Sequence, residues 1–431
     1  MNYYSLNMKA PNTTFKEAVV KGLAPDKGLY FPESITPLSK SFFNNIQDLS
    51  RHEIAFEAIK QFVSPDIPEK ELKLIIEETL NFDFPIVPIT QNISSLELFH
   101  GPTLAFKDVG ARFMSRCLGY FNKDNNENIT VLVATSGDTG GAVAHGFLGV
   151  KGVDVVILYP SGKVSDIQEK QLTTLGKNIS ALEVDGVFDD CQDMVKQAFL
   201  DKELTSVMQL TSANSINVAR WLPQMFYYFF AYQDLSKQHK NIVFSVPSGN
   251  FGNICAGMMA QRLGLPIHHF IAANNSNNVV TNYLKTQKYE PQPAIATISN
   301  AMDVGNPSNF IRIEELFGKS FNELSTHLTS YSYSDEATKK ALKRLYFDYN
   351  YIADPHGAVG FLAAEDYLKT NPNAHCVVLE TAHPAKFLDI VEETIRENIE
   401  LPAQLDKVMK KKKKSLKMAT YHDLKYFLLN R

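Results

Sequence analysis

The sequence predicts an α/β fold built on parallel sheets that helices cover on both faces. From about residue 129 onward, short apolar segments rich in β-branched residues alternate with segments of helical periodicity. This alternation is typical of buried parallel strands and their crossover helices. Glycine-rich turns follow several of these strands, at the carboxyl ends where open α/β sheets bind ligands.

Residues 1–93 have a different pattern and are expected to form a separate unit. A turn at 25–28 precedes a predicted strand at 29–31. Apolar residues at helical spacing predict a helix over 54–62. A second helix is expected to begin near Pro68, because proline fits the first helical turn, and to end near Leu80.

From about residue 129 onward, the sequence predicts a repeated order of strand, turn and helix. Strands are expected at 129–134, 153–158, 179–184, 242–246, 267–272 and 376–379. The helices that follow the turns are expected at 142–148, 168–175, 190–199 and 254–263. Residues 225–232 are the most apolar segment, but they are far shorter than the roughly 20 residues of a membrane span and predict a buried helix.

Composition narrows the class of protein. The chain has 431 residues, 44% of them hydrophobic, and a formal net charge of −4. Since domains have roughly 150 residues, a chain of this length is expected to form two or three of them. The negative net charge argues against nucleic acid or an anionic membrane as a partner. Four cysteines without metal-ligand spacing predict reduced thiols, no metal site and a cytoplasmic protein. The lysine run 410–414 is expected to be a solvated, mobile surface segment.

Lys107 is the first candidate for chemistry. It ends an apolar stretch after a Gly-Pro turn, at the expected start of a helix. Desolvation and the positive end of a helix dipole both lower the pKa of a lysine, and a neutral amine condenses with carbonyl compounds to a Schiff base. The alternative is a lysine that only lays its stem on the surface.

Two glycine-rich turns are candidate anion sites. Residues 248–253 stand between a predicted strand and a predicted helix, so that backbone N–H groups face a ligand such as a phosphate. The turn fits neither the dinucleotide nor the P-loop pattern. Residues 135–141 occupy an equivalent place and suit a carboxylate. Their Asp-Thr-Gly triplet has no second copy, which argues against an aspartic protease. For both turns a simple helix cap remains the alternative.

Two further clusters have polar side chains in similar positions. Residues 214–220 combine amide, hydroxyl and guanidinium groups that suit a second phosphate, the alternative being a helix start with an exposed arginine. Thr381 follows the last predicted strand, where its hydroxyl would meet a ring nitrogen or simply cap the strand.

Together these motifs resemble the threonine synthase family of pyridoxal-phosphate enzymes, of the tryptophan-synthase-β fold type. The resembling runs are HGPTLAFKD, ATSGDTGGAVAH, SANSINVAR, PSGNFGN, SNAMDVGNP, DPHGAVG and TAHPAKF, with GLAPDKGLYFPE near the start. They occur in the family's order over about 98–387. The resemblance implies PLP fold type II: two three-layer αβα domains with parallel sheets and the active site between them, plus a small N-terminal domain. The expected boundaries are 1–93, then 94–122 with 211–431 for the large domain, and 123–210 for the small one.

The resemblance also assigns roles. It implies that Lys107 carries pyridoxal 5'-phosphate and serves as the catalytic base. The implied cofactor ligands are Gly249, Asn250, Phe251, Gly252, Asn253 and Thr381. The implied ligands of the substrate carboxylate are Ser136, Gly137, Asp138 and Thr139, and those of the substrate phosphate are Lys163, Ser215, Asn217 and Arg220. The chain departs from many relatives at Asn253, often aspartate, and at Glu380, often glycine.

The implied reaction converts O-phospho-L-homoserine and water to L-threonine and phosphate, by γ-elimination and β-addition, in a monomer or homodimer. Two alternatives stay open at this point. A pyridoxal-phosphate dehydratase would share the fold but have no leaving phosphate to bind. A catalytically silent homologue would bind amino acids or phosphates as a sensor, against which the intact Lys107, phosphate turn and Thr381 argue.

Overall fold

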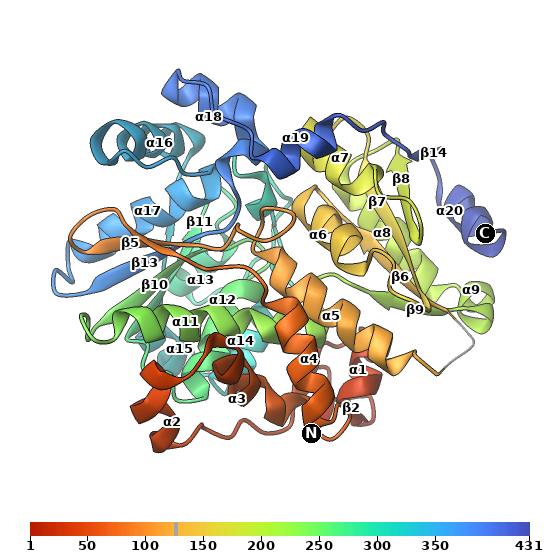
Figure 1. Cartoon of the computed structure of the whole chain (residues 1–431), viewed down its shortest axis with the longest axis horizontal. Coiled ribbons are helices and arrows are strands. Elements are labelled where there is room, and N and C mark those ends of the chain that lie inside the picture. Colours follow the sequence, from red (N-terminus) through yellow and green to blue (C-terminus); the bar gives the residue numbers. More distant parts are fainter. Residues whose placement is uncertain (125–127) are drawn as a thin grey trace. The chain divides into compact units, whose positions relative to one another are not determined.

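The chain passes back and forth between two units in the computed structural model, which describes residues 1–124 and 128–431 (Figure 1). Unit 1 consists of Met1–Phe31, Lys107–Arg220 and Leu401–Arg431. Unit 2 consists of Pro32–Phe106 and Trp221–Glu400. Each unit contains one large sheet, and each is therefore assembled from segments that lie far apart in the sequence.

Unit 1 is built on a five-stranded parallel sheet with the strand order β14-β8-β7-β6-β9. The strands are β6 (Ile129–Ala134), β7 (Val153–Pro160), β8 (Ile179–Val184), β9 (Gln209–Ser212) and β14 (Leu416–Met418). In Figure 1 the blue C-terminal strand β14 lies beside the yellow-green β8. β6 and the core of β7 are fully buried, which explains why these strands read as continuous apolar runs.

Two groups of helices cover this sheet. The first group contains α5 (Lys107–Phe121), α6 (Asp138–Phe147), α7 (Asp166–Thr173) and α19 (Ala403–Met409). The second contains α8 (Phe188–Leu200), α9 (Lys202–Val207) and α20 (Tyr421–Leu429). A hydrophobic core joins the second group to the sheet through Val156, Leu182, Cys191, Ala198 and Leu424. Unit 1 is thus a three-layer αβα structure.

Unit 2 is built on a six-stranded sheet with the order β12-β11-β10-β13-β5-β4. The strands are β4 (Ile86–Pro88), β5 (Ile93–Glu97), β10 (Ile242–Pro247), β11 (His269–Asn274), β12 (Leu328–Ser332) and β13 (His375–Glu380). All neighbours run parallel except β4, which is antiparallel to β5 at the edge. Because β10 and β13 are adjacent and parallel, the turns that follow them emerge at the same edge.

Helices also cover both faces of this second sheet. One group contains α16 (Asp335–Tyr349), α17 (Pro355–Leu368) and α18 (Leu388–Ile395). The other contains α3 (Arg51–Val63), α4 (Glu69–Thr79), α11 (Phe226–Leu235), α12 (Gly252–Arg262) and α14 (Phe310–Leu316). The remaining helices of the unit are α2 (Lys40–Asn45), α13 (Val279–Thr286) and α15 (Phe321–His327). The apolar segment predicted as a buried helix is α11, whose Phe226 to Ala231 are fully buried.

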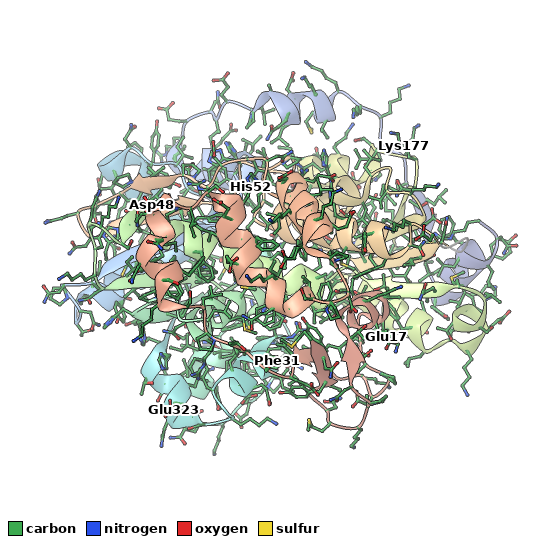
Figure 2. The ribbon with its side chains drawn as sticks, turned by 60° about the horizontal axis from the view of Figure 1, so that its bottom comes forward. Glu17, Phe31, Asp48, His52, Lys177 and Glu323 are labelled. Atoms are coloured by element: carbon green, nitrogen blue, oxygen red, sulfur yellow. The ribbon has the colours of Figure 1, made fainter. Side chains whose placement is uncertain are left out.

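The N-terminal residues contribute to both units. A small sheet with the order β2-β1-β3 contains β1 (Asn2–Ser5), β2 (Thr13–Thr14) and β3 (Tyr30–Pro32), and α1 (Phe15–Lys21) follows β2. The predicted helices at 54–62 and 68–80 are α3 and α4. Ser50 and Glu53 form a capping box that starts α3. His52, labelled in Figure 2, donates from Nε2 to the Leu80 carbonyl at 3.1 Å and ties the two helices together.

Several predicted boundaries are wrong. α6 begins at Asp138 rather than at 142, because the Thr135 Oγ1 accepts the N–H groups of Gly137 and Gly140 and starts the helix early. β11 begins at His269 rather than at 267. Within 214–220 only the last residues are helical, in α10 (Val218–Trp221).

The lysine run 410–414, predicted to be a solvated and mobile surface segment, is held to the sheet of unit 1 at one residue. The Lys413 ammonium lies 2.6 Å from Glu169 and 2.8 Å from Glu183, which anchors the segment that leads into β14. The other lysines of the run are exposed. All four cysteines are buried free thiols, as predicted. None of the helices over the described residues is long and apolar enough to cross a bilayer. Within the same residues, no group of three or more histidine, cysteine, aspartate or glutamate side chains is arranged to hold a metal ion.

Candidate active site

The predicted site residues fall into two groups, one in each unit. In unit 2 the turn 248–253 links the carboxyl end of β10 to the first residue of α12. Phe251 takes a left-handed conformation with φ of 60°, which turns the chain sharply into the helix. Gly252 and Asn253 form the first helical turn, whose N–H groups lack partners within the helix. The turn therefore directs backbone donors to one point, as an anion site requires.

Gly249 is held against a neighbouring loop. A Cβ at this position would lie 2.8 Å from Met302 Cα and 2.9 Å from the Ala301 carbonyl oxygen. Asn250 continues the contact, because its side-chain oxygen accepts from the Ser308 hydroxyl at 3.1 Å. Only glycine fits at 249, and the loop 299–309 supports the turn from behind.

Asn253, one of the departures from the resembling family, is 7% exposed. Its side-chain oxygen accepts from the Tyr228 hydroxyl at 2.8 Å. Among the residues that the structure describes, its amide nitrogen has no hydrogen-bond partner. A buried donor without a partner costs free energy, so this nitrogen is suited to an acceptor that the chain itself does not provide.

Thr381 directly follows β13, the strand beside β10. Its carbonyl accepts from the Phe106 N–H at 2.9 Å, and an isolated bridge joins Ala105 to Ala382. Phe106 directly precedes Lys107, so this hydrogen bond holds the chain to β13 up to the residue before the lysine. Lys107 is the first residue of α5 and is half-buried, as the sequence predicts.

In unit 1 three strand ends carry the other group. The turn after β6 contains Ser136, Gly137, Asp138 and Thr139, and Asp138 opens α6. The buried Gln168 donates to the Asp138 carboxylate at 3.0 Å. Gly137 has a φ of 140°, and a Cβ there would lie 2.4 Å from the Gln168 side chain. Sequence reasoning missed Gln168, although Ser165 and Gln168 have the spacing of a capping box.

The segment 213–220 follows β9 at the same edge, because β9 and β6 are parallel neighbours and Asn214 donates to the Ala134 carbonyl at 3.2 Å. Asn217 is fully buried, and its amide donates to the carbonyls of Val19 and Ser212. Its side chain therefore fixes the backbone of the segment. Ser215 is half-buried, whereas Lys163, in the loop after β7, is exposed.

Arg220 is buried at 3% exposure, so the alternative of an exposed arginine at this position is wrong. It donates to the Ala213 carbonyl. Burial lowers the pKa of its guanidinium to about 10, although the nearby Asp108 raises it. A Cβ on Gly110 of α5 would lie 2.5 Å from the Arg220 carbonyl oxygen, so this glycine, also missed from the sequence, lets Arg220 pack against the helix that begins with Lys107.

Comparisons with known proteins identify the family of this chain. The family described as "Pyridoxal-phosphate dependent enzyme" matches residues 95–381. The families "Threonine synthase N terminus" and "Threonine synthase, C-terminal" match residues 2–80 and 357–427.

Individual relatives cover nearly the whole chain. Threonine synthase of Buchnera aphidicola subsp. Baizongia pistaciae is 46% identical over 94% of both chains, and that of Escherichia coli K12 is 42% identical over 94% of both. The crystal structure of the Escherichia coli threonine synthase superposes with a TM-score of 0.94 at 40% identity, covering 100% of both chains. PLP-bound threonine synthase from Brucella melitensis gives 0.93 at 34% identity, covering 99% of this chain and 98% of that one. The chain belongs to the threonine synthase family of pyridoxal-phosphate-dependent enzymes.

Proposed function

We propose that this protein converts O-phospho-L-homoserine and water to L-threonine and phosphate, with pyridoxal 5'-phosphate as its cofactor. One observation supports this most directly: a phosphate-type turn and a threonine hydroxyl follow adjacent strands of one sheet, and the chain that enters Lys107 is hydrogen-bonded to that threonine. The family relationship supplies the reaction, and the site supplies residues for each of its parts.

The residues present fit the cofactor. Its phosphate needs several N–H donors and room for close approach. The first turn of α12 provides such donors, and the glycines at 249 and 252 carry no side chain that would stand between the turn and a ligand. The Asn253 amide nitrogen is a buried donor still in need of an acceptor. We assign Gly249, Asn250, Phe251, Gly252 and Asn253 to the phosphate and the Thr381 hydroxyl to the ring nitrogen. When bound, the cofactor withdraws electrons from the carbon atoms next to the substrate's amino group.

Lys107 would hold the cofactor and move the protons. Its position at the start of a helix and its partial burial favour a neutral amine. That amine would accept the proton of the substrate's α-carbon, release it to the cofactor, and so be neutral again to accept the proton of the β-carbon as phosphate leaves the γ-carbon. The same amine returns a proton when water has added to the β-carbon.

Substrate recognition is assigned to unit 1. Ser136, Gly137, Asp138 and Thr139, at the start of α6, would bind the substrate's carboxylate through hydroxyl and N–H groups. Lys163, Ser215 and Arg220 would bind its phosphate, with Asn217 holding the segment in place. Arg220 supplies a fixed positive charge, since even at a pKa of about 10 it stays protonated near pH 7.

We also infer the setting in which the enzyme works. Buried free thiols and a net charge of −4 favour a cytoplasmic enzyme with small-molecule partners, without nucleic acid, as a monomer or homodimer. We also propose that the chain divides into its N-terminal, large and small domains near residues 93, 122 and 210.

The test measures threonine and phosphate together from O-phospho-L-homoserine. Equal amounts of both products, abolished in Lys107→Ala and retained in Lys343→Ala, would support the proposal; Lys343 is an exposed lysine on α16 and serves as the matched control. Phosphate without threonine would indicate a dehydratase-like fate. A protein that takes up no cofactor would favour a sensor.

Arg220→Ala tests the phosphate assignment separately. We expect it to lower turnover of the phosphorylated substrate far more than it weakens binding of an unphosphorylated amino acid. Equal losses would contradict the assignment.

A further inference from the structure

Glu380 is a buried carboxyl group immediately before Thr381. It is 1% exposed and ends β13. Its Oε1 accepts the Asp354 N–H at 2.6 Å. Its Oε2 lies so close to the first turn of α17 that a Cβ on Gly357 would be 1.6 Å away. Glu380 therefore occupies the space in front of α17, which is available only because residue 357 is a glycine.

Asp354 extends this contact to a histidine. One of its carboxylate oxygens caps α17 by accepting the Gly357 N–H at 2.7 Å, and the other lies 3.2 Å from His356 Nδ1. The second ring nitrogen, His356 Nε2, accepts the Ala301 N–H at 3.2 Å. Asp354 and His356 are 0% and 2% exposed, so the hydrogen bonds of Asp354 with Gly357 and His356 are shielded from water.

Ala301 also packs against the turn 248–253, because its carbonyl oxygen lies 2.9 Å from the position that a Cβ on Gly249 would take. A continuous series of contacts, buried except at the half-buried Ala301, thus leads from the residue beside Thr381 to Gly249. We call Glu380, Asp354, His356 and the Ala301 backbone the Glu380 network. All of its members belong to unit 2.

We propose that the Glu380 network positions the two ends of the cofactor site, Thr381 and the Gly249 turn, relative to one another. Glu380 and His356 are then positioning residues, which act on the cofactor through Thr381 and Ala301. The proposal rests on the proposed function, since it takes both ends as cofactor ligands.

The surroundings of Glu380 favour its neutral form. Burial, together with the nearby carboxylates of Asp354 and Glu97, raises the pKa of Glu380 well above its usual range. Among the described residues, no cation forms an ion pair with it. A neutral carboxyl still accepts the Asp354 N–H through its carbonyl oxygen, which is the contact that the network requires.

The other titratable groups around Glu380 come from each neighbouring element. Glu97 of β5 pairs with His100 at 2.7 Å and with Tyr351 at 3.2 Å. His356 lies on α17, and Tyr351 precedes that helix, where burial raises the pKa of its hydroxyl. Beyond Thr381, burial lowers the pKa of His383 to about 4, so this ring adds no charge near neutral pH.

A raised carboxyl pKa predicts a definite pH effect. The folded chain keeps the Glu380 proton at pH values where the unfolded chain, with a carboxyl pKa of 4.5, has lost it. Stability therefore falls as the pH rises above that value. Glu380→Gln keeps the acceptor and cannot ionise. The melting temperature of Glu380→Gln minus that of the wild type should therefore increase as the pH rises above 4.5.

The experiment compares pyridoxal-phosphate affinity, measured by cofactor absorbance after removal and re-addition, in four full-length variants. Glu380→Gln should bind within about twofold of the wild type, whereas Glu380→Leu should bind about tenfold more weakly. His356→Leu breaks the network at its other end and should weaken binding similarly, which keeps the test valid if Glu380→Leu does not fold. Glu365→Gln, on the outer part of α17 and paired with Arg344, is the control and should leave affinity unchanged.

Two results would overturn the proposal: unchanged affinity in both leucine variants, or a Glu380→Gln variant that binds as weakly as Glu380→Leu. Failure of the proposed function looks different. In that case the wild type binds pyridoxal phosphate, the variants rank as expected, and no threonine forms.

Discussion

Gly249→Ala is expected to weaken cofactor binding by crowding the phosphate turn. The added Cβ would lie 2.8 Å from Met302 Cα and 2.9 Å from the Ala301 oxygen, where ordinary contact begins at 3.4 Å. The two segments must therefore separate by about 0.6 Å, and both neighbours are backbone atoms that cannot rotate away.

The loop behind Gly249 has little freedom to yield. Asp303 holds it by accepting from Asn275 at 2.8 Å and from the Thr297 hydroxyl at 2.7 Å. Overpacking of a well-packed site typically costs about 1–3 kcal/mol. If the turn rather than the loop moves, that cost appears as a dissociation constant for pyridoxal phosphate raised about 5- to 140-fold.

The assay titrates cofactor-free protein with pyridoxal phosphate and follows absorbance, with a thermal melt of each sample. Gly141→Ala is the matched control, because its Cβ would meet its nearest neighbour, Gln171 Cβ, at an ordinary 3.4 Å within helix α6. It should bind the cofactor normally and be as stable as the wild type or slightly more so. Equal affinities for both alanine variants would refute the crowding argument.

Two other predictions concern stability. Lys413→Ala should cost about 1–2 kcal/mol near pH 7. Burial alone would raise the pKa of Glu183, but hydrogen bonds from Lys413, Ser161 and Ser415 lower it to about 2. The stabilisation by the Lys413–Glu183 pair is therefore complete above the unfolded carboxyl pKa of 4.5 and is lost as the pH falls towards 2. The urea unfolding curves of the wild type and Lys413→Ala should accordingly converge in acid. In Asp303→Asn the amide oxygen can keep the hydrogen bonds from Asn275 and from the Thr297 hydroxyl, which share one carboxylate oxygen, but the NH2 group then faces the Thr297 N–H that donates to the other oxygen. The substitution should cost about 1–3 kcal/mol in urea unfolding, together with weaker cofactor binding; an unchanged midpoint would contradict the role given to this loop.

The central strands were predictable because they are buried on both faces. β6 and β8 begin and end where the apolar runs 129–134 and 179–184 do. Lys107 at the start of a helix was predictable for a similar reason, since the Gly-Pro turn and the apolar run before it are local signals. Local sequence thus determined these strands of the unit 1 sheet and the helix start that carries the lysine.

What the sequence did not reveal depends on contacts between distant segments. β14 has exposed residues at Leu416 and Lys417 and becomes a strand only by pairing with β8. The burial of Arg220 depends on Gly110, more than a hundred positions earlier in the chain. Gln168 and Glu380 act through side chains that reach other elements. Tertiary contacts of this kind leave no periodic pattern in a single sequence.

The placement of β14 has a consequence for how the enzyme is made. This strand covers the outer edge of β8, and it comes from residues 416–418 of a 431-residue chain. During synthesis from the N-terminus, β8 is therefore complete long before its cover exists, and its free edge exposes unpaired N–H and C=O groups to other nascent chains. Chains that end before β14 are expected to aggregate during production even though every proposed site residue has already been made.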